Sequence, residues 1–599
     1  MADEIPEILN KISGWKAQSA DMRLLYDQRW AKNHQIIKGI FGEDETTKSR
    51  VRGRSKIYYR KVWASSWRMV ASFYNAFLKD RDTFKIEGRG PEDEHNKAKV
   101  LQFMTEYRRD RMFRTQSLFL KTVWAFFNIV NYGWTCGKWY WDYNAETGKD
   151  EPVYILYPNE QVFPDLSAET KEQMRYIIFV NHMTKEDMED AGYENIDKCV
   201  PSAVPSNPLR SARYENDRDP MQNPGSNEYP KPGRYGDDQK DGTNVRQTYE
   251  VWECFYREKG KIKFSVSNAG KVELKKVVDS PYGDRYPATM GTCLTLSHKL
   301  IGEGFPEPLE GPQESINAIL NMRKDNVAMN LNKGAIVARH GAVDLQSLAN
   351  RRTGSITLAN DVNAVKWDEI PDVTQSAYVE ASVDENMMAE MSGITPGKQG
   401  MEGSDKATVA QINYSEANAK IDLFIALVGE TYMRDFYTQL ACLIQKFETD
   451  EKVYRIANDR FRKDKQAPYA EEVYDIDIEA DCIINVGMGT VGRDMELKQT
   501  FLAMDRAMMS NQSLIQLVSI GAAPPTGIRL FDTTTFMEDI LPKLGHKDIN
   551  KYFIQVQNAP QQGTEGGMNQ GLAGQGAPQQ GDGNMGIDNM LQMGSMGGI

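Results

Sequence analysis

The glycine-rich segment Gly487-Met-Gly-Thr-Val-Gly492 has the spacing that comes closest to a known chemical motif. Its GxGxxG pattern follows an expected strand and precedes an expected helix, as a dinucleotide-binding turn does. The helix expected at 493–509 leads into a further helical segment near Gln512, so no second strand supplies the acidic residue that would bind a ribose. We interpret the segment as a structural turn and keep a nucleotide-binding enzyme that uses Gly487–Gly492 as the alternative.

Two further patterns are weaker candidates for binding phosphate or metal. The segment 393–398 is one residue shorter than a P-loop, and Gln399 stands where a serine or threonine would hold magnesium. Four acidic residues alternate along an expected strand and would share one face: Asp475, Asp477, Glu479 and Asp481. These carboxylates could bind a cation, but a solvated strand face is the favoured interpretation.

Histidine and cysteine give no sign of a metal centre or a nucleophile. The six histidines are isolated and the six cysteines include no CxxC pair, so zinc-ligand spacing is absent from the sequence. We expect the cysteines to be buried, reduced thiols rather than a disulfide framework. The sequence therefore predicts a protein that is not an enzyme, with no catalytic, cofactor-binding or metal-binding residues.

The overall charge limits how the chain can meet nucleic acid. Its 72 basic and 84 acidic residues give a net charge of -12, which argues against binding DNA over the whole surface. An acidic conduit for DNA remains compatible with this charge, because few phosphate contacts let a duplex slide. The longest apolar stretches, 122–130 and 423–428, are shorter than the roughly 18 residues that a membrane span needs.

The first residues, 1–7, are acidic and lack the apolar region of a signal peptide, so we expect synthesis in the cytoplasm. A basic, aromatic stretch follows at 50–68. Its cations and rings suit nucleic-acid contact, but they also suit an amphipathic helix with snorkelling basic side chains. The spacing of Trp63, Trp67, Val70 and the aromatic residues that follow, to Phe77, favours packing of these rings in the core.

The remaining pattern predicts a helix-rich α+β chain of several domains. An N-terminal helical region at 1–41 is followed by a helix pair at about 91–110 and 112–131, which is expected to end at Gly133. Strands follow, with a short helix that begins at Thr184 in a capping-box pattern and a hairpin that turns at 257–260. Residues 200–246 are expected to be a polar loop or disordered insertion.

Helix, β and loop segments then follow in a defined order: a helix at 311–333, a small β-containing segment at 335–371, a helix at 373–392, a glycine-rich loop at 394–407 and a very long helix at 408–448. A strand is expected after them, at 473–486.

That order resembles the portal proteins, or head-to-tail connectors, of tailed double-stranded DNA bacteriophages. Local sequence is similar too, notably Gly311-Pro-Gln-Glu-Ser-Ile-Asn317 for the stem, Pro158–Asp165 for the wing, and Ser392-Gly-Ile-Thr-Pro396 before the tunnel loop. The resemblance covers roughly residues 50–556. The insertion at 200–246 and the Gly/Gln/Met tail depart from the family pattern, and no heptad repeat supports a C-terminal barrel.

The resemblance implies a subunit with wing, stem, clip and crown regions that assembles as a ring. The implied regions are N-terminal helices and wing at 1–305, stem helices at 306–334 and 372–393, clip at 335–371, tunnel loop at 394–407, long helix and wing return at 408–490, crown helices at 491–556 and a disordered tail at 557–599.

The function that the resemblance implies is mechanical. A dodecameric ring at one capsid vertex of the virion would be the channel for genome packaging and ejection. It would contact double-stranded DNA, the terminase, a head-tail adaptor protein, and the major capsid and scaffolding proteins, with no membrane partner. Another virion structural protein is a further alternative to this function.

The resemblance also points to candidate contact residues. Lys398 and Lys406 fall in the implied tunnel loop and would touch phosphates transiently as point charges, although solubilising loop charges fit the two lysines equally well. Weaker candidates for docking of the terminase or the adaptor fall in the implied clip: Arg339, His340, Arg351 and Arg352.

Overall fold

The computed structural model describes residues 7–41, 54–79, 83–90, 92–144, 148–201, 208–209, 248–338, 343–350, 356, 358, 361–371, 374–393, 420–464, 473–484, 502 and 504–512. The chain divides into two units, Met1–Arg506 and Ala507–Ile599. In the second unit only a short helical stretch, 507–512, is described. The elements below all belong to the first unit, which mixes helices and antiparallel sheets as expected from the sequence.

The largest sheet among the described residues is antiparallel and has five strands. Its order is β4-β5-β6-β7-β8, from strands β4 (Val162–Pro164), β5 (Tyr176–Met183), β6 (Tyr249–Glu258), β7 (Lys261–Asn268) and β8 (Val272–Asp279). Two tight hairpins fix its register. Lys259-Gly260 joins β6 to β7 as a two-residue turn, and both residues have the positive φ that suits such a turn between twisted strands. The β7–β8 connection has three residues, 269–271, of which Ala269 and Gly270 also have positive φ. The hairpin predicted around 257–260 is confirmed by β6 and β7.

A second sheet has the order β3-β2-β9, formed by β2 (Thr135–Asn144), β3 (Lys149–Tyr157) and β9 (Ala288–Gly291). It follows α5 (Leu118–Tyr132), which ends at Gly133 as predicted. Gly133 has φ +72°, and a Cβ there would lie 2.5 Å from the backbone of Glu303, so both the turn and the packing require glycine.

Four helices of the described residues precede this sheet: α1 (Glu7–Lys38), α3 (Lys61–Phe77), α4 (Glu92–Thr115) and α5. The predicted helix boundary near residue 111 is wrong, because α4 continues to Thr115 before the chain turns at Gln116 and Ser117. The short helix α6 (Lys185–Asp190) begins with the predicted capping box, in which the Thr184 hydroxyl accepts from the Asp187 N–H and the Asp187 carboxylate accepts in return.

The long helix expected at 408–448 is described from Lys420 onward. It is helical to Phe447, with a π-helical turn at Gly429–Met433 followed by α12 (Arg434–Phe447). Helix α13 (Glu451–Asp464) comes next, and β12 (Ala480–Ile484) pairs with β1 (Phe84–Gly88). The strand predicted at 473–486 is therefore shorter than expected, because the chain before Ala480 has no ladder partner.

The main hydrophobic core lies between these helices and the smaller sheet. Rings from β2, β3 and the long helix meet there, with Trp139, Tyr154 and Phe436 within about 5 Å of one another between centroids. The hydroxyls of Tyr154 and Tyr432 lie 2.9 Å apart inside this core, so the π-helical turn places a polar contact in an aromatic cluster. The long helix is thus buried in the body of the first unit.

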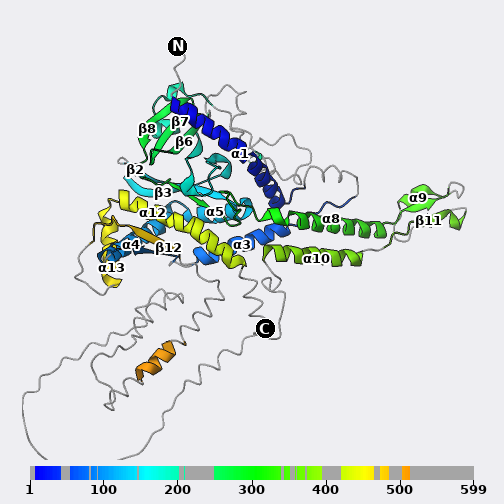
Figure 1. The fold of residues 1–599 in the computed structure, drawn as a ribbon. Coiled ribbons are helices and arrows are strands. Elements are labelled where there is room, and N and C mark those ends of the chain that lie inside the picture. The colour runs from blue at the N-terminus through cyan, green and yellow to red at the C-terminus, as the bar shows by residue number, and fades with distance from the viewer. Residues whose placement is uncertain are drawn as a thin grey trace, which may run out of the picture. The chain divides into compact units, whose positions relative to one another are not determined.

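Two further helices, α8 (Pro306–Leu331) and α10 (Thr374–Ser392), lie side by side, as Figure 1 shows. Between them in sequence come β10 (Ala335–Val337), the short helix α9 (Leu345–Ala349) and β11 (Val365–Trp367), and β10 pairs antiparallel with β11. The helix–β segment–helix order predicted over 311–392 is confirmed for the described residues. The predicted helix start at 311 is wrong, because α8 begins at Pro306 and Pro312 lies inside it.

Candidate functional site

Helices α8 and α10, together with β10, α9 and β11, form what we call the helix arm. Two side-chain contacts join its helices: the Ser315 hydroxyl donates to Asp384 at 2.6 Å, and the Arg323 guanidinium lies 4.1 Å above the Tyr378 ring. In these contacts, higher residue numbers on α8 meet lower residue numbers on α10, so the two helices run antiparallel. The Asn326 amide on α8 also donates at 3.1 Å to the carbonyl of Pro371, which precedes α10.

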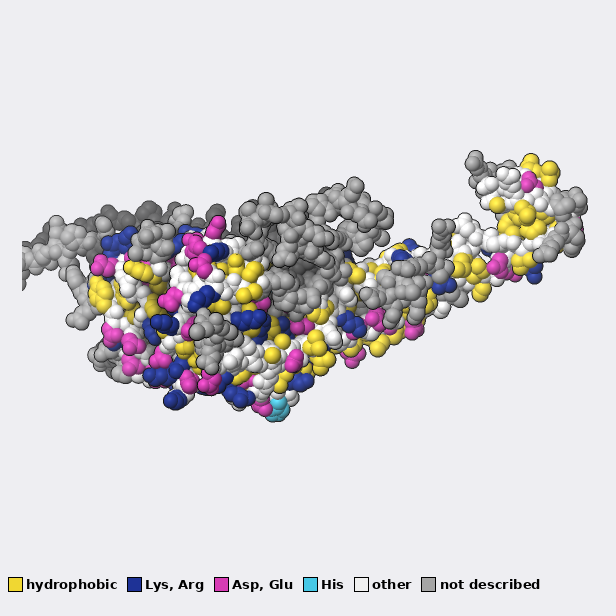
Figure 2. Space-filling view, turned by 90° about the horizontal axis from the view of Figure 1, so that it is seen from above, with side chains coloured by type: hydrophobic (Ala, Val, Ile, Leu, Met, Phe, Trp, Pro, Cys, Tyr) yellow, Lys and Arg dark blue, Asp and Glu magenta, His cyan; other side chains and the backbone are white. Residues whose placement is uncertain are grey.

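The helix arm leaves many apolar side chains exposed. Four of them recur every fourth residue along α10 and form one ridge: Val379, Val383, Met387 and Met391. We call this set the α10 ridge. In Figure 2, hydrophobic and acidic side chains lie together along the helix pair that leads to β10 and β11. Two packed helices can bury only the sides that face each other, so a single copy leaves this ridge in water.

An extended segment, residues 54–60, is bound along α8 through backbone groups. The N–H groups of Ser55, Ile57 and Tyr59 donate to side chains on α8 at 2.6 to 2.8 Å. The acceptors and donors on α8 are spaced four residues apart and lie on one face: Gln313, Asn317, Asn321 and Asp325. We call this set the amide ladder.

The amide ladder works because two repeats match. Four residues of helix rise about 6 Å, and two residues of extended chain span about 6.6 Å. Successive ladder side chains therefore bind every second residue: Asp325 binds Ser55, Asn321 binds Ile57 and Asn317 binds Tyr59. Gln313 binds at the end of the segment, where it accepts from the Val62 N–H and donates to the Tyr59 carbonyl. Asn321 uses both ends of its amide, accepting from the N–H of Ile57 and donating to its carbonyl at 3.0 Å. The four polar residues were visible in the sequence at this spacing, but what they would bind was not.

The predicted helix over the basic stretch is wrong for residues 54–60, since α3 begins only at Lys61. Burial of the aromatic stripe is also only partly right. Val70, Phe73 and Phe77 are buried, whereas Trp63 is 44% exposed and Trp67 is 41% exposed. Helix α3 carries apolar residues on two faces, and only one of these faces the core. A periodic stripe in sequence cannot tell which face that is.

The exposed rings of α3 join others on α5. Trp67 contacts Phe127 with centroids 5.6 Å apart, and Tyr74 contacts Phe119 at 6.1 Å, so the two helices present one continuous surface. We call it the aromatic face, and it consists of Trp63, Trp67 and Tyr74 on α3 with Phe119, Leu120 and Trp124 on α5. A monomeric soluble protein rarely exposes so many large apolar side chains together.

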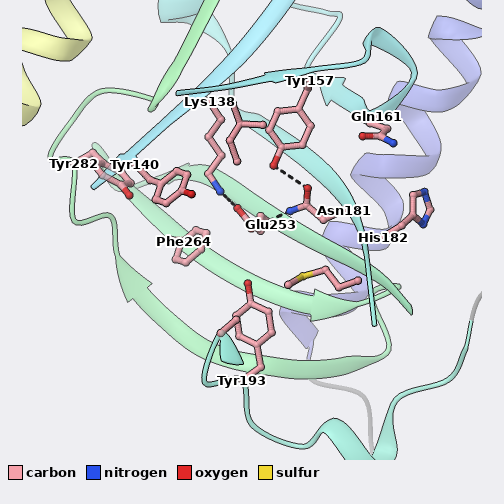
Figure 3. Close-up of a pocket in the computed structure, with 13 residues that line it drawn as sticks. Lys138, Tyr140, Tyr157, Gln161, Asn181, His182, Tyr193, Glu253, Phe264 and Tyr282 are labelled. Carbon is pink, nitrogen blue, oxygen red and sulfur yellow. Dashed lines mark hydrogen bonds and ion pairs between the residues drawn. The ribbon is translucent and has the colours of Figure 1, made fainter. Parts of the chain in front are cut away.

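A pocket between the two sheets holds a buried polar chain (Figure 3). The Lys138 ammonium on β2 pairs with the Glu253 carboxylate on β6. The Asn181 amide donates to the same carboxylate at 3.0 Å, and the Tyr157 hydroxyl donates to Asn181 at 2.8 Å. Burial lowers the pKa of Lys138 to about 7 and raises the pKa of Tyr157.

The cavity of this pocket measures about 730 Å³, enough for a small molecule. Its lining residues include no serine, no cysteine and no carboxylate other than Glu253, and that carboxylate is already engaged by Lys138 and Asn181. The polar chain links strands of both sheets. This chain of contacts forms a cross-link that holds the two sheets together.

Three of the four alternating acidic residues at 475–481 are paired with cations from other segments. The Lys97 ammonium lies 2.5 Å from the Asp475 carboxylate, and Arg89 lies 2.5 Å from Asp481 and 3.9 Å from Glu479. The hydrogen bond from Lys97 lowers the pKa of Asp475. Among the described residues, no group of three or more His, Cys, Asp or Glu could hold a metal ion. Only Asp481 belongs to a strand, so the shared strand face predicted for all four acids is wrong.

The residues predicted to contact DNA or docking proteins all lie outside the described residues: Lys398, Lys406, Arg339, His340, Arg351 and Arg352. The Gly487–Gly492 turn lies outside them as well. Their roles remain predictions. No helix in the described part of the chain is long and apolar enough to cross a membrane.

Comparison with known protein families gives a match. The model of the family described as phage SU10 portal protein matches residues 149–582, well over half of the chain. The matched stretch contains the five-stranded sheet, the helix arm and the long helix. No curated protein matches the sequence.

Proposed function

The chain belongs to the phage SU10 portal protein family, and we propose that copies of this phage portal protein assemble into a dodecameric ring at one capsid vertex of the virion. The ring is the channel through which double-stranded DNA is packaged and ejected. It is a structural component that binds DNA and other phage proteins without chemical turnover. The family match, over a stretch that includes the whole helix arm, is the observation that carries this proposal.

The helix arm supports assembly on physical grounds. A free antiparallel helix pair with a row of exposed valine and methionine side chains is costly in water, at about 25 cal/mol for each Å² of apolar surface. Around a ring, each arm would stand between two neighbours and lose that surface to them. Closed rings need such head-to-tail contacts, in which two different surfaces of each copy meet.

In this proposal α8 and α10 are the stem helices, 335–371 is the clip, and 394–407 is the tunnel loop that projects into the channel. The clip docks the terminase during packaging and the head-tail adaptor afterwards, through Arg339, His340, Arg351 and Arg352. Capsid and scaffolding proteins contact the ring at the vertex. Lys398 and Lys406 meet the phosphates of passing DNA as transient point charges on an acidic path.

Electron microscopy of the purified full-length protein tests the ring. We expect ring-shaped particles with a central hole, and a native mass that is a multiple of the 67.9 kDa chain. A protein that stays a compact monomer at every concentration and salt condition would contradict the proposal.

The role of the tunnel loop is tested separately in packaging. The double variant Lys398→Ala/Lys406→Ala should form rings as the unmodified protein does, but should package or retain less DNA. Normal packaging by rings of this variant would remove both lysines from the mechanism and leave the ring itself in place.

A further inference from the structure

We propose that the aromatic face of one copy is covered by the α10 ridge of a neighbouring copy. This inference rests on the proposed ring and names the two surfaces that meet in it. Each surface is exposed in a single copy, and the two differ in shape and charge in complementary ways.

The aromatic face has the residue types of a binding surface. Trp124 is 53% exposed, and it lies with Trp63 and Trp67 on two helices that pack side by side. Tryptophan and tyrosine dominate the energetics of protein interfaces because they bury a large area with little loss of conformational freedom. Three exposed tryptophans on one surface therefore indicate a site that a partner covers.

One end of the aromatic face continues into a hollow. A cavity of about 330 Å³ lies beside Phe119, and it is lined by Leu78 and Phe113 with Lys79 and Arg114 among its other residues. A convex apolar side chain from a partner would fit such a hollow, and an acidic residue next to that side chain would meet the two cations.

The α10 ridge matches the aromatic face in length. From Val379 to Met391 the ridge runs about 18 Å, and from Trp63 to Tyr74 the α3 part of the face runs about 16 Å, at 1.5 Å per residue. On α3 the two tryptophans are also four residues apart. Rows of side chains at this spacing pack into the grooves between rows on a facing helix.

The charges of the two surfaces are opposite. Helices α3 and α5 contain Lys61, Arg68 and Lys121 and no acidic residue. Helix α10 contains four acidic residues and no basic one: Glu380, Asp384, Glu385 and Glu390. An aromatic, basic surface and an apolar, acidic helix attract each other and repel a second surface of their own kind.

Part of the acidic charge on α10 is used within the copy. Asp384 accepts from Ser315, and Glu385 pairs with Lys61 at 2.9 Å. Glu380 and Glu390 are exposed, and their carboxylates make no ion pair among the described residues. Arg68 on α3 is exposed in the same way. These three groups remain for contacts between copies.

A second copy is the occupant that this arrangement favours. A ring needs two different and mutually complementary surfaces on each subunit, and the described residues supply one of each. A segment of the same chain outside the described residues, or another phage protein, are the other possible occupants. The experiment below separates all three.

Rings are assembled from two kinds of copies. One kind carries the photo-crosslinker benzoylphenylalanine in place of Trp67, and the other is unmodified and labelled with heavy nitrogen. After illumination, mass spectrometry should find the light peptide that contains position 67 joined to the heavy peptide that contains 374–392. Cross-links within light chains only, as a segment of the same chain would give, or to a different part of the heavy chain would overturn the inference while the ring stands. Rings without any cross-link from position 67, the result if another phage protein covers the face, would overturn it as well. Absence of rings would instead overturn the proposed function.

A mutational test measures the strength of the contact. The triple variant Trp63→Ala/Trp67→Ala/Trp124→Ala should raise the concentration needed for ring assembly by at least about tenfold, as loss of central aromatic contacts does. Leu25→Ala, on the exposed side of α1, is the matched control and should leave assembly unchanged. Because all four side chains are exposed, circular dichroism should show unchanged folding. Unaltered assembly of the triple variant would contradict the inference.

Discussion

The body of the first unit, by which we mean its described residues outside the helix arm, contains buried charged side chains that pair within the same copy. Arg108 on α4 makes two hydrogen bonds, of 2.6 and 2.5 Å, to the Glu448 carboxylate at the end of α12, and both side chains are at most 1% exposed. In the helix arm, by contrast, apolar side chains such as Val383 and Met387 face water. The buried charges of the body are thus paired within one copy, whereas the α10 ridge of the arm and the aromatic face of the body remain for another chain to cover.

This difference separates two kinds of stability. The body needs correct folding of a single chain, so its key contacts should govern the free energy of unfolding. The exposed rows of the arm add little to the fold of a single copy and should govern assembly. The four experiments below test that separation, beginning with the largest expected effect.

The buried ion pair in the body gives the largest expected effect. Glu448→Ala leaves the Arg108 guanidinium buried without its carboxylate, which should lower the free energy of unfolding by about 3 to 5 kcal/mol. Urea denaturation measures this loss. Asp197→Ala breaks the exposed pair between Lys185 and Asp197 and is the control, with an expected loss of at most about 1 kcal/mol. Equal losses for the two variants would contradict the role assigned to the buried pair.

The second effect concerns assembly alone. Val383→Glu places a carboxylate in the α10 ridge and should weaken the ring by about tenfold or more, because a charge in an apolar contact must be desolvated. The midpoint of urea unfolding of the single chain should not change. Assembly is measured by light scattering across a dilution series.

Val278→Glu on β8 is the matched control for this change. Val278 is 42% exposed and Val383 is 46% exposed, so the two valines differ in location and little in exposure. The control should assemble normally. If both variants lost assembly equally, the α10 ridge would have no special part in it.

The third effect is local and concerns the amide ladder. Asn321→Ala removes two hydrogen bonds to Ile57 and should cost about 1 kcal/mol. Hydrogen exchange should show faster exchange of the Ile57 amide, which is paired in the unmodified protein. Asn330→Ala, farther along α8, contacts Asn326 instead and should leave exchange at Ile57 unchanged.

The smallest effect is at the surface of the body, where Lys97 lowers the pKa of Asp475. A carboxyl with a lowered pKa stabilises the fold above its ordinary pKa near 3.8, and this contribution is lost as the pH falls through the lowered value. Lys97→Ala should therefore raise the pKa of Asp475 toward its ordinary value, measured by NMR titration. An unchanged pKa would show that Lys97 does not hold the carboxylate in solution.

Much of the fold was predictable because it depends on local chemistry. The glycine after α5, the capping box before α6 and the hairpin between β6 and β7 each follow from residues a few positions apart. The order of helices around the clip-like segment was also readable from hydrophobic periodicity, and the resemblance to portal proteins that rested on it is confirmed by the family match.

The candidate site was less predictable. The sequence-based prediction of contact residues concerned the implied tunnel loop and the implied clip. All six residues lie outside the described part of the chain: Lys398, Lys406, Arg339, His340, Arg351 and Arg352. The α3 rings of the aromatic face were predicted to lie in the core, since periodicity identifies an apolar stripe but not the side of the helix that meets a partner. The amide ladder was missed because its partner segment lies more than 250 residues away in the sequence.

The sequence by itself determined the elements, their order and the family, because these depend on spacing between near neighbours along the chain. It also determined the acidic balance of the chain, with a net charge of -12. Only the tertiary structure decided which side chains meet: Arg108 with Glu448, Asn321 with Ile57, and the exposed rings of α3 with those of α5. The physical reason is that exposure and pairing depend on which distant segments pack together. The spacing of neighbouring residues in the sequence does not specify those distant contacts.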